Sequence, residues 1–143
     1  MNLVIDASVA AKWFLADSPG EDDAERALAI LAGTVACEHV LHQPPHFVAE
    51  VAAVLSRLKP DQVQRDIADL LAIRFEQGNS SEIYATAISM AIRYGQHVFD
   101  TLYHATAIRS PDAMLVTADR RYFLKAGAAG RICLLSDFEG AGA

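Results

Sequence analysis

The chain has 143 residues and a hydrophobic fraction of 52%, which suits a single globular domain spanning residues 1–143, with only 140–143 resembling a loose tail. The net charge of −6 argues against a general nucleic-acid coat protein, which would be basic. It does not exclude a nuclease, because carboxylates that hold a metal ion also lower the charge of the chain. The two cysteines lack metal-ligand spacing and fit a reducing cytosol.

The start of the chain has no positively charged stretch before Asp6, so we do not expect a signal peptide. No apolar run approaches the roughly 20 residues that a membrane span needs. We therefore expect a cytoplasmic protein without a membrane partner.

The predicted elements alternate along the chain between short apolar strands and longer helices. The predicted strands cover residues 3–5, 39–42, 72–76, 113–117 and 132–135. The predicted helices cover residues 7–15, 19–32, 46–58, 60–71, 80–95, 100–110 and 120–125. Ser18-Pro19-Gly20-Glu21 resembles a capping box and Gly33 a helix stop, and the apolar spacing of the fourth helix predicts that Leu70 and Leu71 face inward.

This alternation is typical of an α/β fold with a parallel sheet covered on both faces. In such sheets, functional sites form beyond the carboxyl ends of the strands. Asp6 and Asp119 directly follow predicted strands, and Asp100 begins a predicted helix that reaches the same edge.

Four carboxylates lie in apolar surroundings and are the candidate catalytic residues. They are Asp6, Glu50, Asp100 and Asp119. An ionised group next to a core is unfavourable unless something compensates its charge, and of the basic residues only Arg120 and Arg121 directly adjoin one of the four. If the fold gathers these acids, a divalent cation such as Mg²⁺ or Mn²⁺ is the natural compensating charge.

Four segments of the chain resemble the PIN domain family, and specifically the VapC-type toxin ribonucleases of type II toxin–antitoxin pairs. They are Val4-Ile5-Asp6-Ala7-Ser8, Pro44-Pro45-His46-Phe47-Val48-Ala49-Glu50, Phe99-Asp100-Thr101-Leu102-Tyr103-His104-Ala105 and Leu115-Val116-Thr117-Ala118-Asp119-Arg120-Arg121. Each segment alone is a weak indication, whereas four in the family's order form a specific one. His104 departs from the small apolar residues that are usual at its position.

The resemblance implies a three-layer α/β/α sandwich with a central parallel sheet and an endoribonuclease that uses one or two Mg²⁺ or Mn²⁺ ions. It also implies an RNA substrate, a cognate antitoxin that blocks the site, and a homodimer. The four acids match the acidic quartet of the family, and Ser8 and Thr117 match its small hydroxyl positions.

The expected roles follow from the preference of Mg²⁺ for few carboxylates and several waters. We expect Asp6 and Asp100 to hold the first ion. Asp119 would bind a second ion or orient the attacking water, and Glu50 would act through water or as a base. Arg120 and Arg121 would contact RNA phosphates or form surface ion pairs.

Structural roles remain open for the same residues. Asp6, Asp100 and Asp119 could each cap a helix, and Glu50 could lie on the solvated edge of one. Ser8 and Thr117 could be local caps or turn residues. His39, His42 and His46 lack a compact zinc geometry, since Pro44 and Pro45 separate them.

Three other functions compete with the ribonuclease. A structure-specific DNA nuclease usually carries more acids and long basic insertions. A phospho-acceptor signalling domain needs an acidic pair after its first strand, whereas only Asp6 is found there. A catalytically silent interaction module would have no reason to keep all four acids.

Overall fold

The computed structural model describes residues 1–140, so of the predicted tail only Gly140 falls within it. Its sheet consists of β1 (Asn2–Ile5), β2 (Val40–Gln43), β3 (Glu76–Gln77), β4 (Met114–Thr117) and β5 (Ile132–Leu134). All neighbouring strands are parallel, and their order across the sheet is β3-β2-β1-β4-β5. β1 therefore lies at the centre, between β2 and β4.

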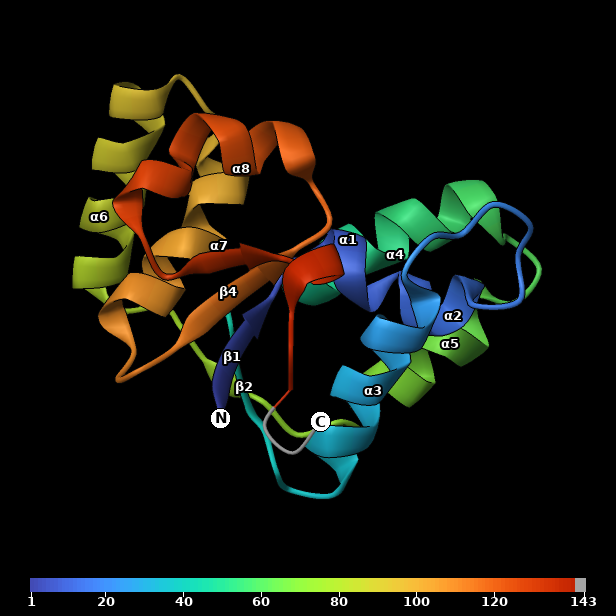
Figure 1. Cartoon of the computed structure of the whole chain (residues 1–143). Helices are drawn as coiled ribbons and strands as arrows, with labels where there is room; N and C mark the ends of the chain where they lie inside the picture. Colours follow the sequence, from blue (N-terminus) through green and yellow to red (C-terminus); the bar gives the residue numbers. More distant parts are fainter. Residues whose placement is uncertain (141–143) are drawn as a thin grey trace.

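Helices cover the sheet on both sides. They are α1 (Ala7–Ala10), α2 (Lys12–Leu15), α3 (Ala24–Val35), α4 (Phe47–Leu58), α5 (Val63–Leu71), α6 (Ser81–Tyr94), α7 (Val98–Arg109) and α8 (Arg120–Ala126), with short 3-10 turns at Gly127–Ala129 and Leu135–Asp137. Figure 1 shows α6, α7 and α8 on one side of the sheet and α1 to α5 on the other. The predicted α/β/α sandwich with a central parallel sheet is confirmed.

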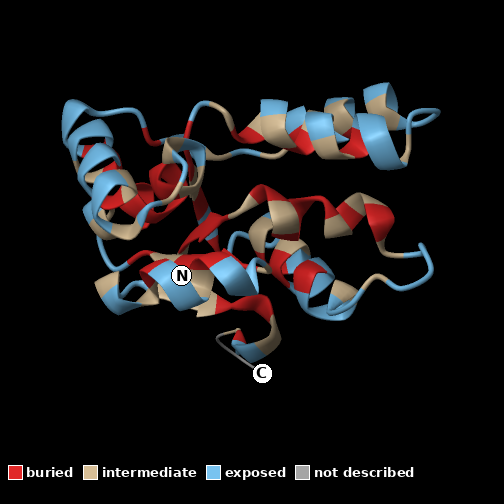
Figure 2. Cartoon of the chain, turned by 90° about the horizontal axis from the view of Figure 1, so that it is seen from above, coloured by how far each residue is buried: buried red, intermediate tan, exposed pale blue. Residues whose placement is uncertain are grey.

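The core explains why the central strands are continuous apolar runs. Leu3, Val4 and Ile5 are fully buried, because helices pack on both faces of β1. In Figure 2 the buried residues lie on the sheet and on the helix sides that face it, while the outer sides of the helices are exposed. Burying apolar surface on both faces fixes the strands whose ends carry the candidate site.

The predicted start of the second helix at Ser18-Pro19-Gly20-Glu21 is wrong. α3 begins only at Ala24, after Asp23 in a left-handed conformation. Lys12 accounts for the delay, since its Nζ donates to Glu21 Oε1 and to the carbonyl of Asp22, both at 2.7 Å. These contacts hold the acidic segment as a loop against α2.

Gly33 does not end α3, which runs on to Val35. A Cβ at Gly33 would lie 2.5 Å from Cδ2 of the buried His39 ring, so glycine provides room for a close approach. The sequence pattern for a helix stop therefore marks a packing contact in this chain.

Two further predictions on the α5–β3 segment are wrong. Leu71 is 62% exposed, whereas Leu70 is fully buried. The strand predicted over residues 72–76 is reduced to β3, because the segment after α5 first forms a turn. Leu71 lines a shallow apolar pocket between α4 and α5 together with Val63 and Ile67.

His104, which departs from the family pattern, is fully buried in α7. Its Nε2 donates to the carbonyl of Gly130 at 2.7 Å, and its Nδ1 lies 3.0 Å from the hydroxyl of Tyr122. The carbonyl bond fixes the proton on Nε2, so Nδ1 accepts from the Tyr122 hydroxyl. Burial lowers the pKa of His104. This neutral histidine joins α7 to α8 and to the turn before β5.

Within residues 1–140, no helix is both long enough and apolar enough to cross a membrane.

Candidate active site

The site begins at the carboxyl ends of two adjacent strands. Asp6 follows β1, and Asp119 lies two residues beyond the end of β4. The amide of Asp6 donates to the carbonyl of Val116 at 3.1 Å, so the β1–β4 ladder continues up to the first acid. Parallel pairing thus places two acids that are 113 positions apart in the chain at one edge of the sheet.

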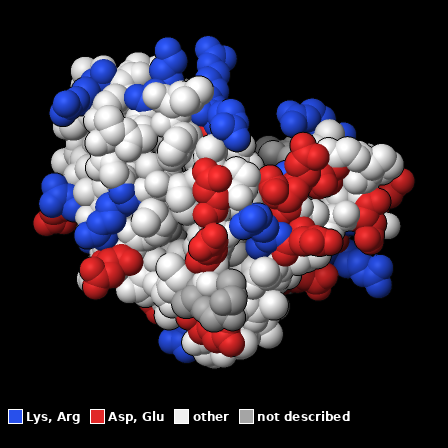
Figure 3. Space-filling view, viewed as in Figure 1, with Lys and Arg blue, Asp and Glu red and all other residues white. Residues whose placement is uncertain are grey.

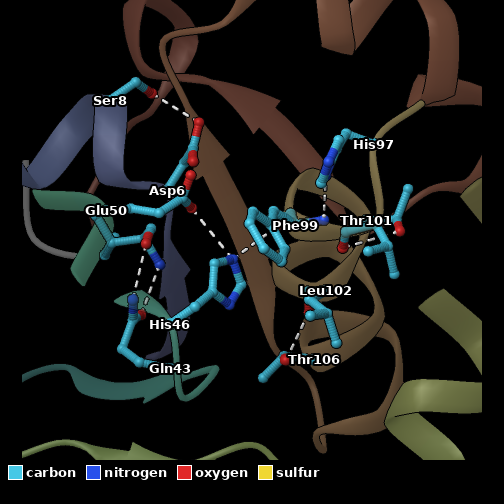
Figure 4. Close-up of polar contacts among 12 residues, drawn as sticks. Asp6, Ser8, Gln43, His46, Glu50, His97, Phe99, Thr101, Leu102 and Thr106 are labelled. Carbon is cyan, nitrogen blue, oxygen red and sulfur yellow. Dashed lines mark hydrogen bonds and ion pairs between the residues drawn. The ribbon is translucent and has the colours of Figure 1, made fainter. Parts of the chain in front are cut away.

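Two hydroxyl groups hold the carboxylate of Asp6. Ser8 Oγ donates to Asp6 Oδ2 at 2.8 Å, a contact seen in Figure 4, and Thr117 Oγ1 donates to the same oxygen at 2.9 Å. The hydroxyls accept in turn from the amides of Ala118 and Asp119, at 3.1 and 3.0 Å. The side chain of Asp6 is therefore tied to the loop that carries Asp119, and within residues 1–140 its Oδ1 accepts no side-chain hydrogen bond.

Gln43, at the end of β2, supports Asp6 from the other side. Its side chain is fully buried; Oε1 accepts from the Ile5 amide and Nε2 donates to the Ile5 carbonyl, both at 2.8 Å. The carboxamide thereby continues the β1–β2 pairing to the residue just before Asp6. Such a contact spans 38 positions of the chain and leaves no local pattern in the sequence.

We predict that Gln43→Met lowers the free energy of unfolding by about 2–4 kcal/mol, because the amide and carbonyl of Ile5 lose their buried partners. Chemical denaturation measures the loss. Gln77→Met is the matched control, since Gln77 is an exposed residue of β3, and this change should alter stability by less than about 0.5 kcal/mol. Equal stability of the two variants would contradict the role assigned to Gln43.

Glu50 lies in the first turn of α4, beside His46. His46 Nε2 is 3.1 Å from Glu50 Oε1 and 2.8 Å from the carbonyl of Phe99 (Figure 4). Within residues 1–140, Glu50 Oε1 and the hydroxyl of Tyr103 are both buried without a hydrogen-bond partner. Burial raises the pKa of Glu50, but the neighbouring His46 and Tyr103 outweigh it and hold that pKa below its usual value.

Asp100 lies in the first turn of α7 but does not cap it. His97 is the N-cap, and its Nδ1 accepts from the amide of Phe99 at 3.1 Å. Burial raises the pKa of Asp100, and the charges of Glu50 and Asp119 raise it further, although His97 and His46 act in the opposite direction. The capping role considered for Asp100 is therefore wrong.

Asp119 does cap a helix, because its Oδ1 accepts from the amide of Tyr122 at 3.0 Å. It is exposed, and its second oxygen remains available to a ligand. The four acids share one structural feature: each lies at the N-cap or in the first turn of a helix, namely α1, α4, α7 or α8. The partial positive charge at a helix N-terminus favours carboxylates there.

The acids also influence one another electrostatically. Burial raises the pKa of Asp6 from 3.8 to about 6; the bonds from Ser8 and Thr117 counteract this, and the charges of Asp100 and Glu50 add to it. Asp6 responds to Asp100 and Glu50, and Asp100 responds to Glu50 and Asp119, so the four form one coupled set. Added positive charge at this edge of the sheet would relieve their repulsion.

The donor groups fit a hydrated divalent cation. They are carboxylate oxygens, and among them Glu50 Oε1 is buried and accepts no hydrogen bond, although His46 Nε2 lies 3.1 Å away. Within residues 1–140, no three His, Cys, Asp or Glu side chains lie close enough to chelate one ion together. An ion at this edge of the sheet would therefore be held by at most two of these side chains, with water in its other positions. Asp6 and Asp100 are the pair whose raised pKa values such an ion would reverse.

Arg120 and Arg121 were predicted to share one role, but they line different pockets. Arg121 lines a pocket with Asp100 and Asp119, whereas Arg120 lines another with Lys12 and Asp22. Consecutive residues of a helix point about 100° apart, which accounts for the separation. His46 and His97 border the site without having been predicted. The signal that could have indicated them is their position directly before the apolar starts of α4 and α7.

The same fold occurs in two solved structures. A chain of the "Toxin-antitoxin complex from Klebsiella pneumoniae" has a TM-score of 0.65 and 18% sequence identity, covering 93% of this chain and 97% of that chain. A chain of "VapBC2 from Rickettsia felis bound to a DNA fragment from their promoter" has a TM-score of 0.58 and 19% identity, covering 94% of this chain and 97% of that chain. At these identities, the likeness shows the fold.

No curated protein sequence matches the chain. The model of the PIN domain family does, over residues 3–128. Domains of this family are generally nucleases that use divalent metal ions. The match covers most of the chain and includes all four acids, and the sheet and its helices agree with it. This chain therefore belongs to the PIN domain family.

Proposed function

We propose that the protein is an endoribonuclease dependent on Mg²⁺ or Mn²⁺, with Asp6, Glu50, Asp100 and Asp119 as its catalytic acids. The observation that carries the proposal is the position of these carboxylates: Thr117 ties Asp6 to the loop that carries Asp119, and Asp119 lines one pocket with Asp100. The raised pKa values of Asp6 and Asp100 support it. Carboxylates with perturbed pKa values cluster at functional sites.

The proposed mechanism assigns a task to each acid. One or two bound ions would supply Lewis-acid stabilisation of the phosphodiester and acidify the attacking water. Asp6 offers Oδ1, because Ser8 and Thr117 hold its Oδ2, and Asp100 supplies the second carboxylate of the first site. Glu50 would act through a water or accept the proton of the attacking water, and Asp119 would hold a second ion or orient that water.

A toxin role and protein partners are part of the same proposal. One of the two similar structures described above is a toxin–antitoxin complex by its title, and the other is VapBC2 bound to promoter DNA. We infer a cognate antitoxin that blocks the site, a homodimer, and action on RNA in the cytoplasm. Growth arrest on expression, relieved by co-expression of a short neighbouring reading frame, would support this role. Expression without any effect on growth would count against it.

We predict that the purified protein cleaves a pool of structured RNAs in Mg²⁺ or Mn²⁺, that EDTA abolishes the cleavage, and that an excess of ion restores it. Gel analysis of end-labelled RNA measures the result, with single-stranded and duplex DNA of matched sequence in parallel. Absence of chelator-sensitive cleavage in both metals would favour an interaction module. Cleavage of DNA alone would favour the DNA nuclease.

A further inference from the structure

A pocket of about 520 Å³ opens beside the acids, where the end of α6, the start of α7 and one face of α8 meet. Asp100 and Asp119 form one part of its lining, and Arg121 and Lys125 another. The volume lies within the range of pockets that bind small ligands. Two of the four proposed catalytic carboxylates thus share a cavity with two cations.

Arg121 and Lys125 are four residues apart on α8, so they project from the same face of the helix. Both are exposed, and within residues 1–140 neither forms an ion pair. They lie near Asp119 without neutralising it. Their charges are therefore available to an anionic ligand that enters the pocket.

Two aromatic rings complete the lining. Tyr94 is partly buried, and the guanidinium of Arg93 lies over its ring at 5.5 Å from the centroid. His97 accepts from the Phe99 amide through Nδ1, as Figure 4 shows, which leaves its Nε2 as the nitrogen that can donate. The pocket therefore offers a flat aromatic surface and a hydrogen-bond donor in addition to its cations.

The distribution of charge over the molecule favours an anion at this place. Residues 78–131 contain six of the twelve basic residues but only four of the eighteen acidic ones. Figure 3 shows basic side chains gathered over α6 and α8, and acidic ones over the loop between α2 and α3. A polyanion approaching the protein is therefore attracted to the side where the pocket opens.

We propose that this pocket binds the nucleotide next to the scissile phosphodiester in single-stranded RNA. Its phosphate contacts Arg121 and Lys125, and its base packs against Tyr94 and His97. Unstacked bases of single strands are commonly held by aromatic side chains, while phosphates bind arginine and lysine. The proposal rests on the ribonuclease function. It adds that the RNA strand lies on the side of the acids where α8 and the end of α6 form the pocket.

The test measures binding of a short fluorescent single-stranded RNA by anisotropy in an Asp6→Asn background, which prevents cleavage. Arg121→Gln and Lys125→Gln should each weaken binding about fivefold or more. Each should also make the negative slope of the logarithm of the association constant against the logarithm of the salt concentration shallower by about 0.7. Tyr94→Ala should weaken binding about fivefold or more with an unchanged slope, whereas Tyr94→Phe should bind normally.

Arg120→Gln is the matched control, because it removes the same charge from the adjacent residue but faces the other pocket. It should change the affinity less than twofold. An equal loss with Arg120→Gln would reduce the effect to general electrostatic attraction and overturn the proposal. Unchanged binding in the Arg121 and Lys125 variants would overturn it as well.

Cleavage by the same variants with Asp6 intact separates this proposal from the function on which it rests. Arg121→Gln and Lys125→Gln should raise KM while changing kcat less than about twofold. Chelator-sensitive cleavage with an unchanged KM would refute the pocket and leave the ribonuclease standing. Absence of cleavage by the parent protein would refute the ribonuclease, and the binding data would still decide whether the pocket takes RNA.

Discussion

Asp6→Asn is expected to reduce the rate of RNA cleavage by about a thousandfold or more, while the protein remains folded. The amide oxygen of asparagine can take the place of Oδ2 and accept from Ser8 and Thr117. The other carboxylate oxygen becomes an amide nitrogen, which cannot bind a cation. The substitution thus removes the proposed ligand and keeps the contacts that position it.

Single-turnover cleavage rates at saturating Mg²⁺ measure this effect, and circular dichroism confirms the fold. Asp112→Asn is the matched control, because Asp112 is an exposed acid in the turn before β4 and asparagine tolerates its φ of 51°. It should cleave at the parental rate. Parental activity in purified Asp6→Asn would remove Asp6 from the mechanism.

The location of the candidate site at one edge of the sheet could be predicted because local sequence patterns mark the strands and the acids that follow them. Leu3–Ile5 and residues 113–117 are short apolar runs, and both are followed closely by an acid. Parallel pairing then brings those ends together, as the hydrogen bond from Asp6 to Val116 shows. The fold class and the location of the candidate site therefore follow from the sequence. The catalytic roles of the acids remain proposals.

The predictions that failed depended on contacts between distant residues. Ser18 to Glu21 has the local form of a capping box, but Lys12 draws Glu21 into a loop. Gly33 has the local form of a helix stop, but the close approach of the His39 ring requires a residue without a side chain at this position. In both places tertiary contacts outweigh the local preference of the sequence.

The supporting residues of the site were missed for a related reason. Gln43 forms hydrogen bonds with the backbone of Ile5, and His46 lies between Glu50 and the carbonyl of Phe99. Polar side chains that bond to distant backbone groups have no periodicity, so a sequence pattern does not reveal them. The structure adds these contacts and distinguishes Arg121, beside the acids, from Arg120.

The stability of the metal-free protein should depend on pH through Asp6. Its pKa rises from 3.8 to about 6 on folding, mainly through burial. Between these values the folded state holds a proton that the unfolded state has lost, so stability falls as pH rises through this window. Below pH 3.8 both states are protonated and the penalty vanishes. Above pH 6 the penalty is complete. It amounts to about 3 kcal/mol, because each pKa unit corresponds to about 1.36 kcal/mol.

Asp6→Asn imitates the protonated form, so the variant should be more stable than the parent at pH 7 in EDTA by about 3 kcal/mol. Its advantage should shrink towards zero as the pH falls from 6 to 4. Urea denaturation of both proteins across pH 4–8 measures the difference, and Asp112→Asn should show no such trend. An advantage that does not vary with pH would contradict the raised pKa.

Addition of Mg²⁺ should reverse this advantage, because an ion that binds only the folded parent stabilises it by an amount that grows with the ion concentration. The parent should therefore gain stability at pH 7 with increasing Mg²⁺, while Asp6→Asn should gain little. This result would link the charge of Asp6 to the ion without any measurement of cleavage. Equal gains in both proteins would place the ion away from Asp6 and would require another acid as its first ligand.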